Sequence, residues 1–249
     1  MKDYAAPPAH LKNRVILVTG AGQGIGRTAA LAFAEKGATI ILLGRTVAKL
    51  EAVYDEIEAA ALAEALIFPL DLATASEQDF VNMAEAIYQQ LGRLDGILHN
   101  AAHFENLSPL EIQTVKQFER TLRVNLIAPF ALTKACLPLL KRAPDASVIL
   151  TSSTAGHHAA AYWGAHAISK NAAEHMMKIW ALELEKTPAI RINTVIPGPL
   201  QSPQRKKSHP GEVHENLPTA QSIMPLYQYL MGADSKGVSG KIFDPQSLA

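Results

Sequence analysis

Short apolar runs alternate along this chain with longer amphipathic stretches, and this alternation restricts its possible folds more than any other feature. Runs rich in Val, Ile and Leu without polar alternation are typical of a parallel sheet that is covered on both faces. They lie at residues 15–18, 39–43, 65–68, 96–98, 147–150, 191–196 and 241–243, and the amphipathic stretches lie at 27–36, 48–61, 77–91, 112–140 and 165–185. Strand and helix in this order form right-handed crossovers. The sequence therefore predicts one α/β domain over residues 1–249, a doubly wound parallel sheet of about seven strands with helices on both faces.

The composition narrows the classes of protein to which the chain can belong. Its 249 residues carry a formal net charge of zero, which gives no electrostatic reason to expect nucleic acid or an anionic membrane as a partner. The first 14 residues lack the apolar core of a signal peptide, and no apolar stretch approaches the roughly 20 residues of a membrane span. Cys136 is the single cysteine, so no intrachain disulfide can form. We therefore expect a cytoplasmic protein that is not inserted in a membrane.

A glycine-rich segment, Thr19 to Gly26, follows the first apolar run directly and opens the first amphipathic stretch. Glycines at this place allow a tight turn and let the backbone approach a pyrophosphate. The helix that follows offers unpaired N–H groups and a partial positive charge. The sequence therefore predicts a Rossmann-type dinucleotide site. Its expected contacts are Gly20, Gln23, Gly24, Ile25 and Gly26.

The residues that close the next three runs extend this candidate site. Arg45 stands where an acid would bond the ribose 2′-hydroxyl of NAD, and an arginine can instead pair with a 2′-phosphate, which favours NADP (NADPH) over NAD. A solvated surface cation is the alternative interpretation of Arg45. Asp71, followed by Leu72, can accept from the adenine amino group or cap the helix after it. Asn100 and Ala101 close the fourth run, where small residues let the backbone pass beside a cofactor.

The order and spacing of these residues resemble those of the short-chain dehydrogenases/reductases over essentially the whole chain. The matching pieces are the segment 19–26, Asp71, Asn100-Ala101, Asn125, Ser153, Lys170 and Pro197-Gly198. The runs 94–101 and 223–232 resemble the YciK-type oxidoreductases in particular. The resemblance implies hydride transfer between a nicotinamide cofactor and a small-molecule carbonyl or alcohol, with no catalytic metal. It also implies pairing into a homodimer or homotetramer through the helices at 112–140 and 165–185.

The resemblance assigns catalytic roles by position. Ser153 would orient the substrate carbonyl, and the spacing favours it over its neighbours Ser152 and Thr154. Lys170 would hold the nicotinamide ribose and lower the pKa of the neighbouring proton donor. Asn125 would help to hold a water and the lysine. The family usually has Asn-Ala-Gly where this chain has alanine after Asn100-Ala101, and the added methyl group is expected to crowd the cofactor slightly.

The family's catalytic tyrosine is replaced by histidine in this chain. His166 stands one helical turn before Lys170, at the first position of a Tyr-x-x-x-Lys frame. A lysine brings the pKa of a phenol, ordinarily about 10, toward a useful value, whereas the same lysine and burial both favour neutral imidazole. Neutral imidazole is a poor proton donor at neutral pH. We therefore expect a loss of about 10²- to 10⁴-fold in rate.

Three interpretations of His166 follow from its chemistry. The first makes it the acid/base, with activity that rises as the pH falls. The second makes the chain an NADP-binding regulatory or sensor protein with weak catalysis. The third makes His166 a variant of an ordinary reductase. Tyr162, one turn earlier, is a further candidate for the phenol, although it lies too near the start of the helix.

Weaker signals lie around the same edge of the predicted sheet. The histidines expected to line the substrate cavity or its rim, in preference to binding a metal, are His99, His103, His157 and His158. The basic run 205–207 is expected to be a solvated face, with an anionic substrate as the alternative. Pro197 and Gly198 are expected to set a rigid turn beside the nicotinamide. The segment at 198–218, rich in Pro, Ser, Lys and His, is expected to be a long substrate loop.

Overall fold

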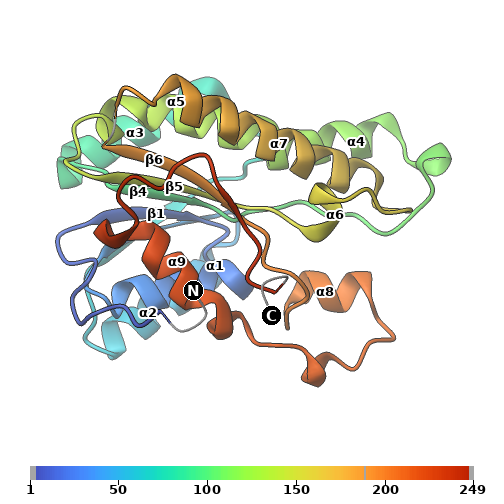
Figure 1. Ribbon diagram of the computed structural model, residues 1–249, viewed down its shortest axis with the longest axis horizontal. Coiled ribbons are helices and arrows are strands. Elements are labelled where there is room, and N and C mark those ends of the chain that lie inside the picture. The colour runs from blue at the N-terminus through green and yellow to red at the C-terminus, as the bar shows by residue number, and fades with distance from the viewer. Residues whose placement is uncertain (1–3, 188, 247–249) are drawn as a thin grey trace.

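A single parallel sheet organises the molecule (Figure 1). The structure is a computed structural model that describes residues 4–187 and 189–246. Within these residues the sheet has seven strands in the order β3-β2-β1-β4-β5-β6-β7. The strands are β1 Val15–Thr19, β2 Thr39–Gly44, β3 Ala65–Pro69, β4 Gly96–His99, β5 Ala146–Thr151, β6 Ile190–Val195 and β7 Ile242–Phe243. The predicted doubly wound α/β fold and each of its expected strands are confirmed.

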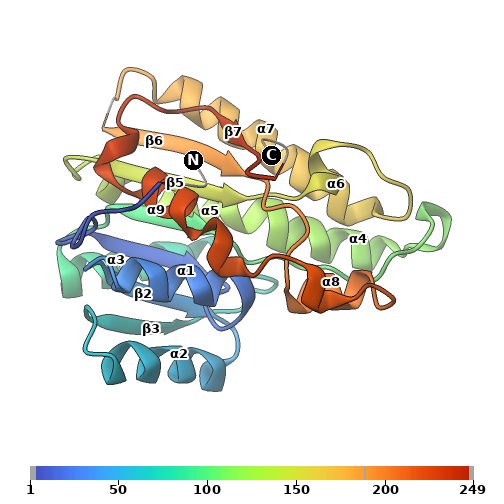
Figure 2. The same ribbon diagram turned by 60° about the horizontal axis from the view of Figure 1, so that its bottom comes forward.

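Helices cover both faces of the sheet (Figures 1 and 2). On one face lie α1 (Gly24–Ala34), α2 (Val47–Ala59) and α9 (Met224–Met231), and on the other lie α3 (Glu77–Leu91), α5 (Ala128–Leu140) and α7 (Gly164–Glu183). Successive side chains of β1 pack alternately against the two helix layers. Ile16 and Val18 pack toward α1, whereas Val15 and Leu17 pack toward α3 and α5. Burial on both sides explains why the strands are continuously apolar.

The strand order reverses between β1 and β4, which places a crevice at the carboxyl edge of the sheet. From β1 the chain moves outward to β2 and β3, and it then returns to pair β4 with the free side of β1. The first connection passes through the glycine-rich segment and α1. Side chains that follow β1, β4 and β5 therefore meet at one edge.

The long apolar helix contradicts one sequence-based expectation. Val115–Leu140, which comprises α4 (Val115–Leu122), a π-helical turn at Arg123–Ile127 and α5, is long and apolar enough to cross a membrane by length and composition alone. The expectation that no such stretch exists is therefore wrong. Leu132, Cys136 and Leu140 of α5 are fully buried in the core against the sheet. This packing is that of a core helix of the α/β domain.

The expected loop at 198–218 contains a helix, α8 (Pro203–Ser208). Ser202 caps this helix by accepting a hydrogen bond of 3.1 Å from the backbone N–H of Arg205, and Pro203 occupies the first helical turn. A short 3₁₀ turn follows at His214–Asn216. The segment therefore contains a capped helix. Its composition, rich in proline and serine, had indicated a loop instead.

Candidate active site

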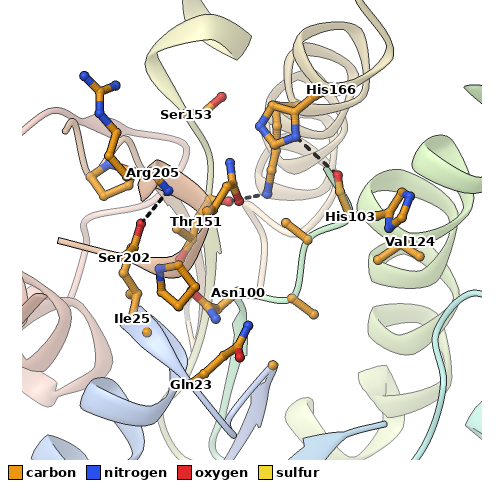
Figure 3. Close-up of a pocket in the computed structure, with 18 of the residues that line it drawn as sticks. Gln23, Ile25, Asn100, His103, Val124, Thr151, Ser153, His166, Ser202 and Arg205 are labelled. Atoms are coloured by element: carbon orange, nitrogen blue, oxygen red, sulfur yellow. Dashed lines mark hydrogen bonds between the residues drawn. The ribbon is translucent and has the colours of Figure 1, made fainter. Parts of the chain in front are cut away.

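A cavity of about 610 Å³ lies at the switch point of the sheet (Figure 3). We call it the main cavity. Most of the predicted site residues line it: Gly20, Gln23, Gly24, Ile25, Arg45, Asp71, Leu72, Asn100, Ala101, Ser153, His166, Lys170, Pro197 and Gly198. Within the described part of the chain, Gly26 and Asn125 are not among the residues that line it. The structure thus brings a cofactor-type loop and a catalytic-type group into one space.

The glycine-rich segment has the backbone conformation that its glycines permit. Gly20 has a φ of +67° and Gly24 has a φ of +56°, which side chains rarely adopt. A Cβ on Gly20 would lie 2.9 Å from the Cα of Ala101. A Cβ on Gly26 would lie 2.3 Å from the carbonyl oxygen of Gly20. The position of Gly26 shows a packing role between α1 and the loop, and its contact with the cofactor stays a prediction.

Thr19 fixes the loop to the neighbouring strand, a role that the sequence analysis missed. Its Oγ1 accepts hydrogen bonds of 3.0 Å from the backbone N–H groups of both Asn100 and Ala101. The same hydroxyl donates to the carbonyl oxygen of Leu98 at 3.2 Å. The cavity floor at β4 is therefore held at a fixed distance from the glycine loop. A threonine directly before the first glycine was the available signal.

Two cations lie beside the end of β2. Arg45 is exposed and lines the main cavity. Lys49, at the start of α2, also lines it, and its Nζ donates a hydrogen bond to Oε1 of Gln23. Lys49 was not among the predicted site residues, although its place four residues after Arg45 in the sequence could have indicated it. Together they give this end of the cavity a positive charge.

Asp71 does not cap the helix after it, so the alternative considered for this residue is wrong. Its Oδ1 accepts a hydrogen bond of 3.0 Å from the backbone N–H of Ala73, which is a local turn. The cap of α3 is Ser76, whose hydroxyl accepts from the N–H of Asp79 at 3.2 Å. Asp71 therefore stays beside the main cavity.

The serine positions after β5 are distinguished by their partners. Ser153 begins the short helix α6 (Thr154–His157), and its Oγ accepts a hydrogen bond of 3.1 Å from the N–H of Gly156. Ser152 instead donates to the buried carboxylate of Glu174 on α7. Ser153 keeps its own hydroxyl proton for a further bond, and its choice as the catalytic serine stays a prediction.

Lys170 lies on the face of α7 that carries His166 and Glu174, at spacings of one helical turn. It is buried, and its Nζ donates a hydrogen bond of 2.7 Å to the carbonyl oxygen of Thr151 (Figure 3). Burial lowers the pKa of Lys170 to about 8, and the charge of Glu174 opposes this change. Glu174 was missed by the sequence analysis, although its i+4 spacing from Lys170 was visible.

Asn125 occupies the π-helical turn between α4 and α5, and it is almost wholly buried. Its Oδ1 accepts from the N–H of His103 at 2.7 Å, and its Nδ2 donates to the carbonyl oxygen of His103 at 3.0 Å. The same amide donates to Oγ of Ser169 at 2.9 Å. Asn125 therefore fixes the backbone of His103 and the helix that carries Lys170. It influences the main cavity through these two contacts.

His166 is buried, with 3% of its surface exposed. Its Nδ1 lies 3.3 Å from the carbonyl oxygen of His103, and its ring lies 5.5 Å, centroid to centroid, from the rings of Phe104 and Trp163. Burial, together with the charge of Lys170, lowers the pKa of His166 to about 4. Both causes act in the direction expected from the sequence, toward the neutral form of this imidazole.

Tyr162 does not replace the missing phenol. Its side chain is 60% exposed, its φ is +72°, and within the described chain it is not among the residues that line the main cavity. The exposed ring and the strained backbone direct this residue away from Lys170. The interpretation of Tyr162 as a substitute acid is therefore wrong.

The four histidines named from the sequence lie in different surroundings. His103 and His158 line the main cavity as expected. His99 is buried, with Nε2 2.8 Å from Oγ1 of Thr133, so the expectation for His99 is wrong. His157 is exposed, pairs with Glu174 at 3.0 Å and lies beside His158, with ring centroids 4.8 Å apart, so its place at the rim stays a prediction. Over residues 4–187 and 189–246 there is no group of three or more His, Cys, Asp or Glu side chains that could hold a metal ion.

The basic run at 205–207 is held by local contacts. Arg205 pairs with Glu212 through two hydrogen bonds of 2.6 and 2.8 Å. Lys207 lies with its Nζ 5.8 Å from the ring centroid of Phe104. The charge of Arg205 is therefore compensated, which weakens the alternative of an anion site.

A glycine loop at the switch point and a serine, histidine and lysine beside it define an oxidoreductase of the Rossmann type. The comparisons with known proteins agree, because residues 14–212 match the model of the short chain dehydrogenase family. The chain belongs to this family.

Its relatives include YciK-type proteins, as the sequence indicated. The chain is 41% identical over 236 residues to the uncharacterized oxidoreductase YciK of Escherichia coli. The matched residues cover 95% of this chain and 93% of YciK. It is similar to a short chain dehydrogenase structure from Pseudomonas syringae, with a TM-score of 0.93, 44% identity and coverage of 98% and 99% of the two chains. A Shigella flexneri short chain dehydrogenase solved with NADP has a TM-score of 0.91, 39% identity and coverage of 96% and 100%.

Proposed function

We propose that this protein is an NADP(H)-dependent oxidoreductase that interconverts a small-molecule carbonyl and its alcohol. The observation that carries the proposal is the main cavity, which joins the glycine loop, Arg45 and the His166–Lys170 pair in one space. The NADP bound by the similar Shigella flexneri protein supports this cofactor. Gly20 and Gly24, which line the main cavity with positive φ before and at the start of α1, fit a loop that binds a pyrophosphate.

In this proposal each group has one task. The dinucleotide, when bound, supplies the hydride donor or acceptor. The N-terminus of α1 faces the pyrophosphate, and Arg45 pairs with the 2′-phosphate. Lys170, held by the Thr151 carbonyl, donates to the nicotinamide ribose, and Ser153 orients the substrate oxygen. His166 exchanges the proton of that oxygen, and the segment 198–218 covers the substrate with α8.

The choice of cofactor is tested at Arg45. We expect Arg45→Ala to raise the Kd for NADPH about tenfold, because a charge-assisted bond to the 2′-phosphate is lost, and to leave the Kd for NADH unchanged. Titration of both cofactors by fluorescence measures this. Lys134→Ala, at an exposed lysine paired with Glu77 on the far layer, is the matched control. An equal loss for both cofactors would contradict the assignment of Arg45.

An NADP-binding sensor with weak catalysis is the second candidate, and the histidine at the tyrosine position favours it. Turnover decides between the two functions. An enzyme oxidises NADPH with carbonyls and reduces NADP⁺ with alcohols at a rate that depends on Lys170. Binding of NADPH without turnover in either direction, in the wild type and in His166→Tyr, would show a sensor.

We propose further that the chain forms a homodimer or homotetramer. Apolar side chains on α5 and α7 support this: Phe130, Ile168, Ile179 and Leu182 are all exposed in the single chain. Phe130 also stacks on Trp180 with ring centroids 6.4 Å apart, so the two helices present one surface. The mass in solution, measured by light scattering, tests it. The cytoplasmic location stays a prediction from the sequence.

A further inference from the structure

We propose that Nε2 of His166 is a hydrogen-bond acceptor for a substrate hydroxyl, so that the site binds an alcohol in preference to the matching ketone. This inference rests on the proposed function and names the form of the substrate that the site prefers. It differs from the role of a phenol, which offers a donor to a carbonyl oxygen. Two observations carry it: the bond made by Nδ1 and the isolation of Nε2.

The partner of Nδ1 sets the tautomer of the ring. Nδ1 lies 3.3 Å from the carbonyl oxygen of His103, and a carbonyl oxygen can only accept. The proton of the neutral imidazole is therefore on Nδ1. The lone pair is left on Nε2. Asn125 holds the His103 backbone from both its N–H and its C=O, which fixes this acceptor in place.

Nε2 is buried and has no hydrogen-bond partner among the described residues. A buried acceptor without a donor is costly, and such groups in folded proteins usually mark a missing ligand or a strained site. The ring of His166 lies between His103, which holds Nδ1, and Ser153 (Figure 3). His166 and Ser153 both line the main cavity. Nε2 itself has no exposed surface, so a ligand that offers an O–H reaches it, and satisfies it, only when the side chains around the ring shift.

The proton transfer can be written in full. The hydroxyl proton of the alcohol passes to Nε2 and gives imidazolium, the carbinol hydride passes to the oxidised dinucleotide, and the C–O bond becomes C=O. In the reverse direction imidazolium returns the proton. The charged groups that face the ring are Lys170 on α7 and the His103–Glu105 pair on the segment after β4, with Lys207 and His209 farther out against Phe104 and Trp163.

These surroundings predict opposite pH profiles for the two directions. Burial and Lys170 lower the pKa of His166 to about 4. Alcohol oxidation needs neutral His166. Its kcat/KM should therefore rise with pH up to about pH 4, and the titration of His166 should cause no further change between that value and neutral pH. Carbonyl reduction needs imidazolium, so its kcat/KM falls about tenfold per pH unit above that value.

The tautomer is tested by NMR on the ¹⁵N-histidine-labelled full chain, with His166→Asn to assign the signals. We expect Nδ1 of His166 in the protonated range and Nε2 in the unprotonated range between pH 6 and pH 8. Protonation of Nε2, or a doubly protonated ring at neutral pH, would overturn the proposal. This measurement needs neither cofactor nor turnover, so it succeeds or fails separately from the proposed function.

Ligand preference is tested on the same samples with 2-propanol and acetone as probes, in the presence of NADP⁺. We expect 2-propanol to shift the Nε2 signal with a Kd at least about tenfold lower than that of acetone. His166→Asn keeps a donor toward the His103 carbonyl but has no acceptor at the Nε2 position, so we expect it to remove the preference. Equal affinity in the wild type, or an Nε2 signal that neither probe moves, would overturn the proposal. If NADPH binding is intact when either of these results is obtained, the preference for an alcohol is wrong but the proposed function is not contradicted.

Discussion

Replacing His166 by tyrosine is expected to raise kcat/KM for carbonyl reduction with NADPH at pH 7 by about 10²- to 10⁴-fold. In the wild type the pKa of His166 is lowered to about 4, so very little imidazolium is present at neutral pH to donate a proton. A phenol at this position is protonated at pH 7, and buried Lys170, one turn away, brings its pKa toward the working range. Because a catalyst leaves the equilibrium unchanged, alcohol oxidation must gain by the same factor.

The control for this experiment is His166→Phe, which fills the same space without a hydroxyl. We expect no gain from phenylalanine, and we expect both variants to keep the NADPH affinity of the wild type. Initial rates over a panel of aldehydes and ketones, followed by NADPH absorbance, measure the difference. A His166→Tyr variant that binds NADPH and reduces carbonyls no faster than the wild type would show that the proton donor does not limit this site.

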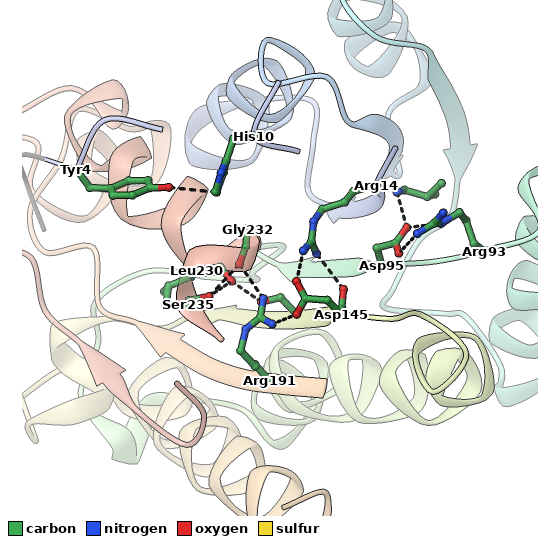
Figure 4. A network of polar contacts seen from close by, with 12 residues as sticks. Tyr4, His10, Arg14, Arg93, Asp95, Asp145, Arg191, Leu230, Gly232 and Ser235 are labelled. Carbon is green, nitrogen blue, oxygen red and sulfur yellow. Dashed lines mark hydrogen bonds and ion pairs between the residues drawn. The ribbon is translucent and has the colours of Figure 1, made fainter. Parts of the chain in front are cut away.

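Replacing Asp145 by alanine is expected to lower the free energy of unfolding by about 3–5 kcal/mol. Asp145 joins two arginines, Arg14 and Arg191, at the amino edge of the sheet (Figure 4). The side chain of Arg191 is 1% exposed and that of Arg14 is 11% exposed. Without the carboxylate, the buried guanidinium of Arg191 loses its ion pair and faces the positive charge of Arg14, while Arg14 still interacts with the charge of Asp95. Each of these arginines keeps one backbone acceptor, Asp145 and Gly232 respectively, at 2.9 Å.

Urea unfolding followed by circular dichroism measures this change, with Glu77→Ala as the reference. Glu77 pairs with Lys134 on the surface, and the two side chains are 70% and 56% exposed. Water and salt screen an exposed pair of this kind, so the reference variant should be close to the wild type in stability. Similar losses from both variants would contradict the assignment of the Asp145 cluster as a buried network.

The strands and the glycine loop could be predicted because local physics determines them. Burial on both faces makes a run such as Val15 to Val18 apolar throughout. Gly20 and Gly24 are required by positive φ values. The neutral state of His166 followed from two effects of the same sign, burial and a neighbouring lysine. These features need only short-range information.

The parts that were wrong or missed depend on tertiary contacts. Asn125 acts through the backbone of His103, 22 residues away in the sequence, and no spacing rule reveals that partner. His99 turned into the core toward Thr133 instead of the cavity. The apolar helix at 115–140 passes a length test for a membrane span because its buried face is a core face. Sequence shows that such residues are present, and only packing shows what they meet.

The central claim is that the main cavity binds NADP(H), and direct titration of the wild-type protein with NADPH and NADH side by side tests it most directly. The nicotinamide fluorescence of each cofactor reports its own binding, without any need for turnover or for the true substrate. We predict saturable binding of NADPH, with a Kd at least about tenfold below that of NADH because of Arg45. Absence of saturable NADPH binding, or tighter binding of NADH, would contradict the account.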